Sequence, residues 1–225
     1  SLGLGVTGSG TTGQFPYYAA NGTTLTATST LFLATNESVG IGSTTPGAKL
    51  GVAGDVYASG FFNTSGVTGG YKLGGQLLGY ASSTNGATVF GLEAGGAATT
   101  TSSNIQSSAF CYRALNSNTL AGSGNSAFGY QALMKGTTIS SNAAFGKGAL
   151  QETVTGNNNV AVGASASQNN ISATTTVAVG AFAAGAGSTF SAQGYTLVGY
   201  SAGRNIVTGS DYNTFLGYQS GKLVT

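Results

Sequence analysis

The stretch AFGYQA at residues 127–132 is one of eight copies of a short motif: a small residue, an apolar residue, glycine, a small or aromatic pair, then Ala or Ser. The glycine position recurs at a near-constant step of about 17–20 residues, which indicates a solenoid, in which each coil buries its apolar face against its neighbours. Its occupants are Gly91, Cys111, Gly129, Gly146, Gly163, Gly180, Gly199 and Gly217. The copies read VFGLEA (89–94), AFCYRA (109–114), AFGYQA (127–132), AFGKGA (144–149), AVGASA (161–166), AVGAFA (178–183), LVGYSA (197–202) and FLGYQS (215–220).

The alternation around each glycine predicts an extended strand. In one copy Val160 and Val162 would lie on one face, and Ala161 and Gly163 on the other, because successive side chains of a strand point to opposite faces. Large residues therefore share one face and very small ones share the other. A face of Ala and Gly lets another backbone approach closely, either inside a flattened coil or where subunits meet.

Turn-rich connectors such as VTGNNN (154–159) and VTGSDYN (207–213) separate the motifs, since Gly, Asn, Ser and Asp favour turns. A coil of this length has room for about two strands of five residues and two turns. We predict an all-β fold, a β-solenoid of the parallel β-roll type with about eight to nine coils of about 17–20 residues. QLLGYASS (76–83) would be a degenerate first coil.

Residues 1–75 follow no such period, and short apolar segments alternate there with turns such as STTPG (43–47). We expect an irregular, β-rich connector or assembly region over residues 1–75 and the solenoid over residues 76–225. The strands predicted in the first region are Leu2–Val6, Gln14–Tyr18, Thr30–Ala34, Ser38–Ile41, Lys49–Val52 and Val56–Phe62.

The composition predicts self-association. Only 5% of the 225 residues are charged, against roughly 25% in an ordinary soluble protein, and the net charge is +2. Weak electrostatic repulsion favours association between copies. The seven Lys and Arg residues are scattered singly, so we expect no nucleic-acid partner. No apolar run is long enough to cross a membrane as a helix, so we expect no transmembrane segment.

The sequence contains no residue pattern typical of catalysis. The chain has no His, the commonest general base and metal ligand, and its five Asp and Glu residues stand far apart. We therefore expect no enzyme activity, no catalytic or metal-binding residues and no cofactor. The single cysteine, Cys111, occupies a glycine position of the repeat. It is either a small buried substitute for glycine or a reactive or intermolecular thiol.

Stacked coils predict ladders of like residues. The residue before each glycine is aromatic in the first four copies and aliphatic in the last four. The position after the glycine holds four tyrosines, which either pack along the ladder or at a subunit contact, or offer a flat surface to glycans. These tyrosines are Tyr112, Tyr130, Tyr200 and Tyr218.

The ends of a solenoid expose unpaired strand edges unless a cap covers them. No cap-like segment follows the last motif, so we expect either that the original protein continues there or that the last coil, with Leu223 and Val224, pairs with the next subunit. The alternating segment Leu2, Leu4 and Val6 would supply a strand to the same junction.

The motifs NSAFGYQAL (125–133), NNVAVGASA (158–166) and NTFLGYQSG (213–221) resemble the head repeats of trimeric autotransporter adhesins and related repeats of phage tail fibres. The resemblance implies a left-handed parallel β-roll, commonly a homotrimer, displayed outside the cell. SVGIGSTTPGAKLGVAGDVYASG (38–60) is similar to segments of tail fibres and of large repetitive bacterial surface proteins. Neither family supplies catalytic residues.

Two functions follow as expectations. The first is a structural subunit that self-assembles into an extracellular filament or fibre through the solenoid ends and the N-terminal strand. The alternative is a trimeric adhesin or tail-fibre segment that binds cell-surface glycans. Both place the protein outside the cell, on a cell surface or a virion appendage.

Overall fold

The structure is a computed structural model that describes residues 11–18, 25–56, 70–73, 76–81, 86–96, 106–117, 122–185 and 187–222. The chain forms two compact units, Ser1–Asn63 and Thr64–Thr225. Their border lies earlier in the chain than the boundary expected near residue 75. The reason is that β5 (Tyr71–Leu73) pairs antiparallel with β6 (Gln76–Ala81) and so joins the sheet of the second unit.

The first unit contains a four-stranded sheet in the order β1-β2-β3-β4. Neighbours pair antiparallel except β3 and β4, which are parallel. The strand expected at residues 14–18 is confirmed, and those expected around residues 30, 40 and 50 fall within or overlap β2, β3 and β4. Leu2–Val6 and most of Val56–Phe62 lie outside the described residues. The strands are β1 (Gln14–Tyr18), β2 (Leu25–Leu33), β3 (Val39–Ile41) and β4 (Leu50–Val52).

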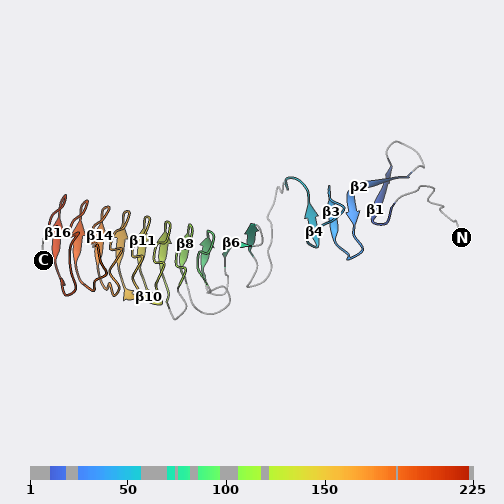
Figure 1. Cartoon of the computed structure of the whole chain (residues 1–225). Helices are drawn as coiled ribbons and strands as arrows, with labels where there is room; N and C mark the ends of the chain where they lie inside the picture. The colour runs from blue at the N-terminus through green and yellow to red at the C-terminus, as the bar shows by residue number, and fades with distance from the viewer. Residues whose placement is uncertain are drawn as a thin grey trace. The chain divides into compact units, whose positions relative to one another are not determined.

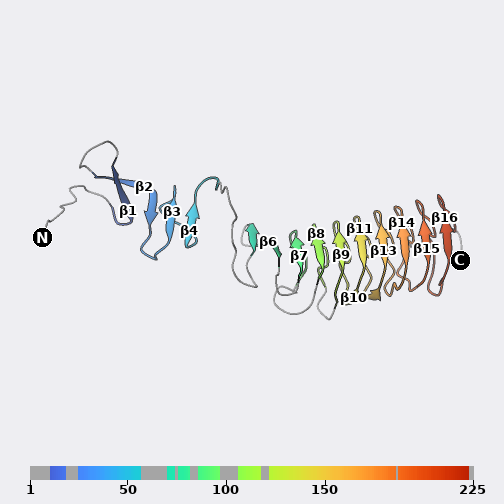
Figure 2. The same ribbon diagram turned by 180° about the vertical axis from the view of Figure 1, so that it is seen from behind.

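The second unit is a β-solenoid, as the repeat predicted. Eight strands, one from each motif, stack in parallel along the axis (Figures 1 and 2). The register aligns equivalent positions, so Ala144 pairs with Ala127 on one side and with Ala161 on the other. The described residues include no helix. The strands are β7 (Thr88–Phe90), β8 (Ser108–Phe110), β9 (Ser126–Phe128), β11 (Ala143–Phe145), β13 (Val160–Val162), β14 (Val177–Val179), β15 (Thr196–Val198) and β16 (Thr214–Leu216).

Three details differ from the prediction. Each strand spans three residues instead of five, and among the described residues a strand on the second side of the coil forms only at β10 (Thr138–Ser140) and β12 (Thr155–Asn157), which pair in parallel. Residues 76–81 form β6, which pairs antiparallel with β7, so this segment is not a coil of the solenoid. The strands are short because the glycine that follows most of them has a positive φ and starts a turn.

The turn glycines bring consecutive coils into close contact. Gly146 has a φ of 136°, and the Gly163 N–H of the next coil donates to the Phe145 carbonyl at 2.8 Å. A Cβ atom on Gly146 would lie 2.5 Å from the Gly163 carbonyl oxygen. Both the dihedral angle and the lack of space therefore require glycine here.

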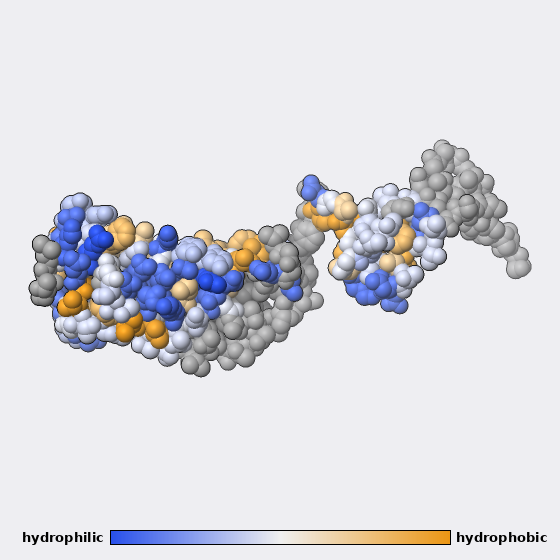
Figure 3. Space-filling model, in the orientation of Figure 1, coloured by the Kyte–Doolittle hydropathy of each residue, from blue (hydrophilic) through white to orange (hydrophobic). Residues whose placement is uncertain are grey.

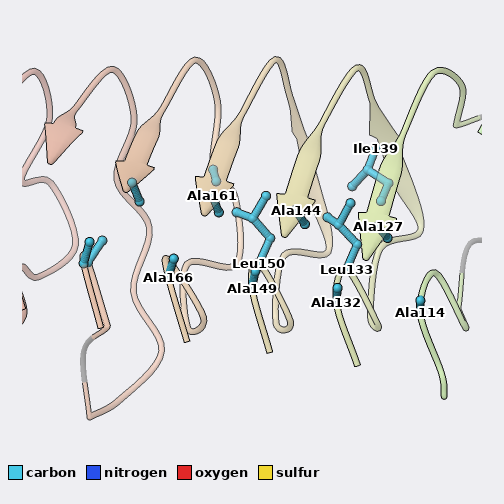
Figure 4. Packing of buried hydrophobic residues seen from close by; sticks show 14 of the residues in the cluster. Ala114, Ala127, Ala132, Leu133, Ile139, Ala144, Ala149, Leu150, Ala161 and Ala166 are labelled. Carbon is cyan, nitrogen blue, oxygen red and sulfur yellow. The ribbon is translucent and has the colours of Figure 1, made fainter. Parts of the chain in front are cut away.

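The interior of the coil is thin and lined mainly by small residues. Ala127, Ala144 and Ala161 point inward from the sheet and are fully buried (Figure 4). Leu133 and Leu150, each of which follows a buried alanine of a turn, fill the remaining space. The small face is thus the inside of a flattened coil, one of the two arrangements that the alternation allowed.

A ladder of buried amides crosses this interior. The Asn142 Nδ2 donates to the Asn125 Oδ1 at 3.0 Å and to the Gly156 carbonyl at 3.0 Å. The Asn142 Oδ1 accepts from both the backbone N–H and the Nδ2 of Asn159, at 3.0 and 2.7 Å. Thr176 ends the run by donating to Asn159. Each amide is satisfied by groups of the neighbouring coils, so the ladder sets the register between coils.

Tyr195 is the largest fully buried side chain of the described solenoid. Its hydroxyl is hydrogen-bonded to the Ser167 hydroxyl and accepts from the Asn170 Nδ2 at 3.2 Å. Burial raises the pKa of Tyr195 above its ordinary value of 10.0, because the phenolate would be poorly solvated there.

We expect Gly146→Ala to lower the free energy of unfolding by about 2–4 kcal/mol, through strain at a positive φ and overlap with the Gly163 carbonyl. Urea denaturation followed by circular dichroism measures the change. Gly187→Ala is the matched control, because an added Cβ meets no atom within 4 Å there. Equal stability of the two variants would contradict the account of the turn.

We expect Asn142→Ala to lower the free energy of unfolding by about 2–4 kcal/mol. The reason is that the Gly156 carbonyl, the Asn159 backbone N–H and the Asn159 Nδ2 lose buried partners. The control is Asn205→Ala, since Asn205 is exposed, and this variant should change stability by less than about 0.5 kcal/mol. A loss for Asn142→Ala as small as that of the control would show that the ladder is not needed.

Tyr195 predicts an alkaline loss of stability. Above pH 10.0 the unfolded chain loses the phenolic proton while the folded chain retains it, so the unfolded state binds fewer protons and stability falls as pH rises. The stability advantage of the wild type over Tyr195→Phe should therefore shrink above pH 10.0. Thermal melts of both proteins on either side of this pH test the prediction, and a constant difference would contradict it.

Candidate functional site

The large residues of the motif form an apolar column on the outer face of the parallel sheet, which we call the outer ladder. Its ends are the most exposed, with Phe90 50% and Leu216 76% accessible. The phenylalanine rings stack, with centroids 4.8 Å apart for Phe110 and Phe128 and 5.0 Å for Phe128 and Phe145. The outer ladder consists of Phe90, Phe110, Phe128, Phe145, Val162, Val179, Val198 and Leu216.

The outer ladder faces outward because the coil has no room for it inside. The residue before each of its members points into the coil, as the buried Ala144 does before Phe145, and alternation then places the larger side chain on the opposite face. Figure 3 shows that hydrophobic residues reach the surface of the solenoid in several groups among hydrophilic ones. Large contiguous apolar surfaces are often interaction sites, so the outer ladder is the candidate functional site of the solenoid.

The four tyrosines fall into two separate stacked pairs. The ring centroids are 5.5 Å apart for Tyr112 and Tyr130 and 5.4 Å apart for Tyr200 and Tyr218. The coils between the pairs hold residues without aromatic rings at this position, namely Lys147, Ala164 and Ala181. The structure therefore supports packing along the ladder within each pair, and it does not bring all four tyrosines into one aromatic surface.

Charged side chains border the first tyrosine pair. The Arg113 Nε donates to the Glu93 carboxylate at 2.6 Å, and this hydrogen bond raises the pKa of Arg113. The Arg113 guanidinium lies 5.1 Å from the ring centroid of Tyr112, and the Lys147 Nζ lies 5.9 Å from that of Tyr130. These contacts hold the cations against aromatic faces.

Cys111 is exposed, so its interpretation as a buried substitute for glycine is wrong. It keeps the positive φ of the glycine position, at 90°. This value lies below the φ of 119–141° at the glycines of the equivalent positions.

The proposed end contacts are not part of the described structure: Leu2, Leu4, Val6, Leu223 and Val224 all lie outside the described residues. Within the described ranges, no three His, Cys, Asp or Glu side chains gather to hold a metal ion. No helix among these residues has the length and apolarity needed to cross a membrane.

The sequence had identified a large face and a small face, but not which of them lies outside. The lengthened steps between Gly180, Gly199 and Gly217 were also visible. They mark connectors that border a hollow lined mainly by polar residues, which no sequence motif indicates.

Searches against protein-family models, curated proteins and solved structures gave no match, so the comparisons assign no family to this chain.

Proposed function

We propose that this protein is a structural subunit of an extracellular filament or fibre and that copies of it associate through the outer ladder. The observation that carries the proposal is the apolar column on the sheet, which runs from the exposed Phe90 to the exposed Leu216. No charged residue interrupts this column.

The size of the column supports a role in association. Eight rungs spaced about 4.8 Å apart give a length of about 34 Å, and with a width on the order of 10 Å the area is on the order of 340 Å². The largest apolar patch on a typical monomer covers about 300–600 Å² and is often functional, and the column falls within this range. The strand residues on the same face add Ala143, Val160 and Val177 in the middle coils.

A second copy of the chain is the partner that this surface fits best. The rungs of one ladder have the spacing of a β-sheet, and another copy has the same spacing over the same number of rungs. With a net charge of +2, electrostatic repulsion between copies is weak. Apolar columns of two copies therefore match along their whole length.

Contacts at the solenoid ends remain part of the proposal. The segment with Leu2, Leu4 and Val6, which the sequence predicts to be extended, would pair with the last coil near Leu223 and Val224 and extend the assembly along its axis. Lateral contacts through the outer ladder and axial contacts through the ends together would produce a fibre.

The alternative function, a trimeric adhesin or tail-fibre segment that binds surface glycans, is favoured by one observation. Tyr218 is 73% exposed and stacks on Tyr200, so the last coils present aromatic faces to solvent. In this alternative the outer ladders would close a ring of three copies instead of an open fibre.

The variant Val162→Lys tests the outer ladder, because it places a charge in the middle of the column on a side chain that is already exposed. We expect wild-type protein to form assemblies and the variant to remain largely monomeric in sedimentation velocity experiments. Asn205→Lys adds the same charge at an exposed position away from the strands, and it should assemble like the wild type.

Unchanged assembly of Val162→Lys, with a native circular dichroism spectrum, would overturn the proposed contact. Electron microscopy of the wild type separates the two functions. Particles that grow without limit support the fibre subunit, whereas a single species of three copies supports the trimeric alternative.

A further inference from the structure

A hollow lined mainly by polar residues lies beside the connectors of three consecutive coils near the C-terminal end of the solenoid. Its volume is about 310 Å³, at the lower end of the range for small-molecule sites. The residues that line it include Ser172, Ser191, Gln193, Thr208 and Asp211. These connectors come after β10 and β12 in the chain, in coils where no second strand forms among the described residues.

The extra residues of the last coils fall in these connectors. The steps from Gly180 to Gly199 and from Gly199 to Gly217 are both longer than the step from Gly163 to Gly180. The strands keep their three-residue length and register throughout. The added length therefore changes the side of the coil that carries the hollow and leaves the sheet unchanged.

Backbone contacts hold the polar groups of the hollow in place. The Ser191 N–H donates to the Thr208 Oγ1 at 3.1 Å, and the Gln193 N–H donates to the Asp211 Oδ1 at 2.9 Å. Between them, the Ala192 carbonyl accepts from the Nδ2 of Asn170 at 2.6 Å, and Asn170 is fully buried. The Thr208 and Asp211 side chains are therefore already held, and held side chains lose less entropy when a ligand binds.

Asp211 differs from the other acidic residues of the described solenoid. Glu93 pairs with Arg113 and Glu152 pairs with Lys135, at 2.6 and 2.5 Å. Asp211 forms no ion pair with any described residue, and its Oδ2 accepts no hydrogen bond from one. The Asp211 carboxylate lines the hollow, and its Oδ2 is available to accept hydrogen bonds from a ligand.

We propose that this hollow is a binding site for one saccharide unit of a glycan. Hydroxyl groups of Ser172, Ser191 and Thr208 can donate and accept, the Gln193 amide can do both, and the Asp211 Oδ2 accepts. A sugar ring presents neighbouring hydroxyl groups that match this mixture of donors and acceptors. The Asp211 carboxylate would accept hydrogen bonds from two of these hydroxyl groups, since charge-assisted hydrogen bonds are the strongest available here.

This site is separate from the outer ladder and from the four tyrosines. It is built from connectors, whereas the outer ladder is built from strands, so the inference does not depend on the proposed self-assembly. It also differs from the glycan contact that the tyrosine column suggested, because none of Tyr112, Tyr130, Tyr200 and Tyr218 lines the hollow.

The test is saturation-transfer difference NMR of the full chain with the methyl glycosides of glucose, galactose, mannose and N-acetylglucosamine. We expect saturation of at least one glycoside by the wild type. Asp211→Asn keeps an acceptor for the Gln193 N–H but loses the negative charge, and it should weaken binding about tenfold or more. Thr208→Val should also weaken binding, because it removes a hydroxyl with little change in the size of the side chain.

Asp55→Asn is the matched control, because it makes the same change at an exposed residue of the first unit, and it should bind like the wild type. Loss of the signal in Tyr218→Ala with full binding by Asp211→Asn would overturn the proposal and assign the glycan contact to the tyrosines. The proposal would also be overturned if no glycoside showed saturation. It would be overturned too if the cation methylammonium, added to the same sample, displaced the glycosides from the hollow. The last result would indicate a simple ion pair with Asp211.

Discussion

The close approach of consecutive coils at the turn glycines is the constraint on which the rest of the solenoid depends. Each turn has a glycine at a φ between 119° and 141°, except at Cys111. In most coils a Cβ at this position would overlap the backbone of the next coil. Because the turn backbones can approach, the parallel hydrogen-bond ladder continues from the strand into the turn, and the polar groups of the turn backbone find partners in the neighbouring coils.

A coil this flat cannot hold a large core, and its composition follows from that limit. The inward positions of the sheet are mostly alanine, and the larger aliphatic side chains come chiefly from the turns and connectors. Asn125, Asn142 and Asn159 can be buried because their amides bond to the neighbouring coils. The asparagines specify register where small apolar side chains alone would allow slippage.

The same limit moves the large apolar residues to the outside. Phe128 and Phe145 stack on each other at the outer face instead of filling an interior, so the side chains that stabilise neighbouring coils also form the surface proposed for association. The connectors, in contrast, can lengthen without disturbing the sheet. Recognition of a ligand, as proposed for the hollow beside Asp211, would therefore evolve independently of the assembly surface.

The sequence by itself determined the solenoid, the approximate number of its coils, and the alternation of large and small residues. The reason is that a repeat of about 17–20 residues, the length of one coil, permits few other folds. It also predicted the ladders, since stacking places equivalent residues above one another. Only the tertiary structure decided that the alanine face lies inside, that Cys111 is exposed, and that residues 76–81 pair antiparallel. Alternation gives both faces of a strand the same period, so only the space available between the two sides of the coil determines which face is buried.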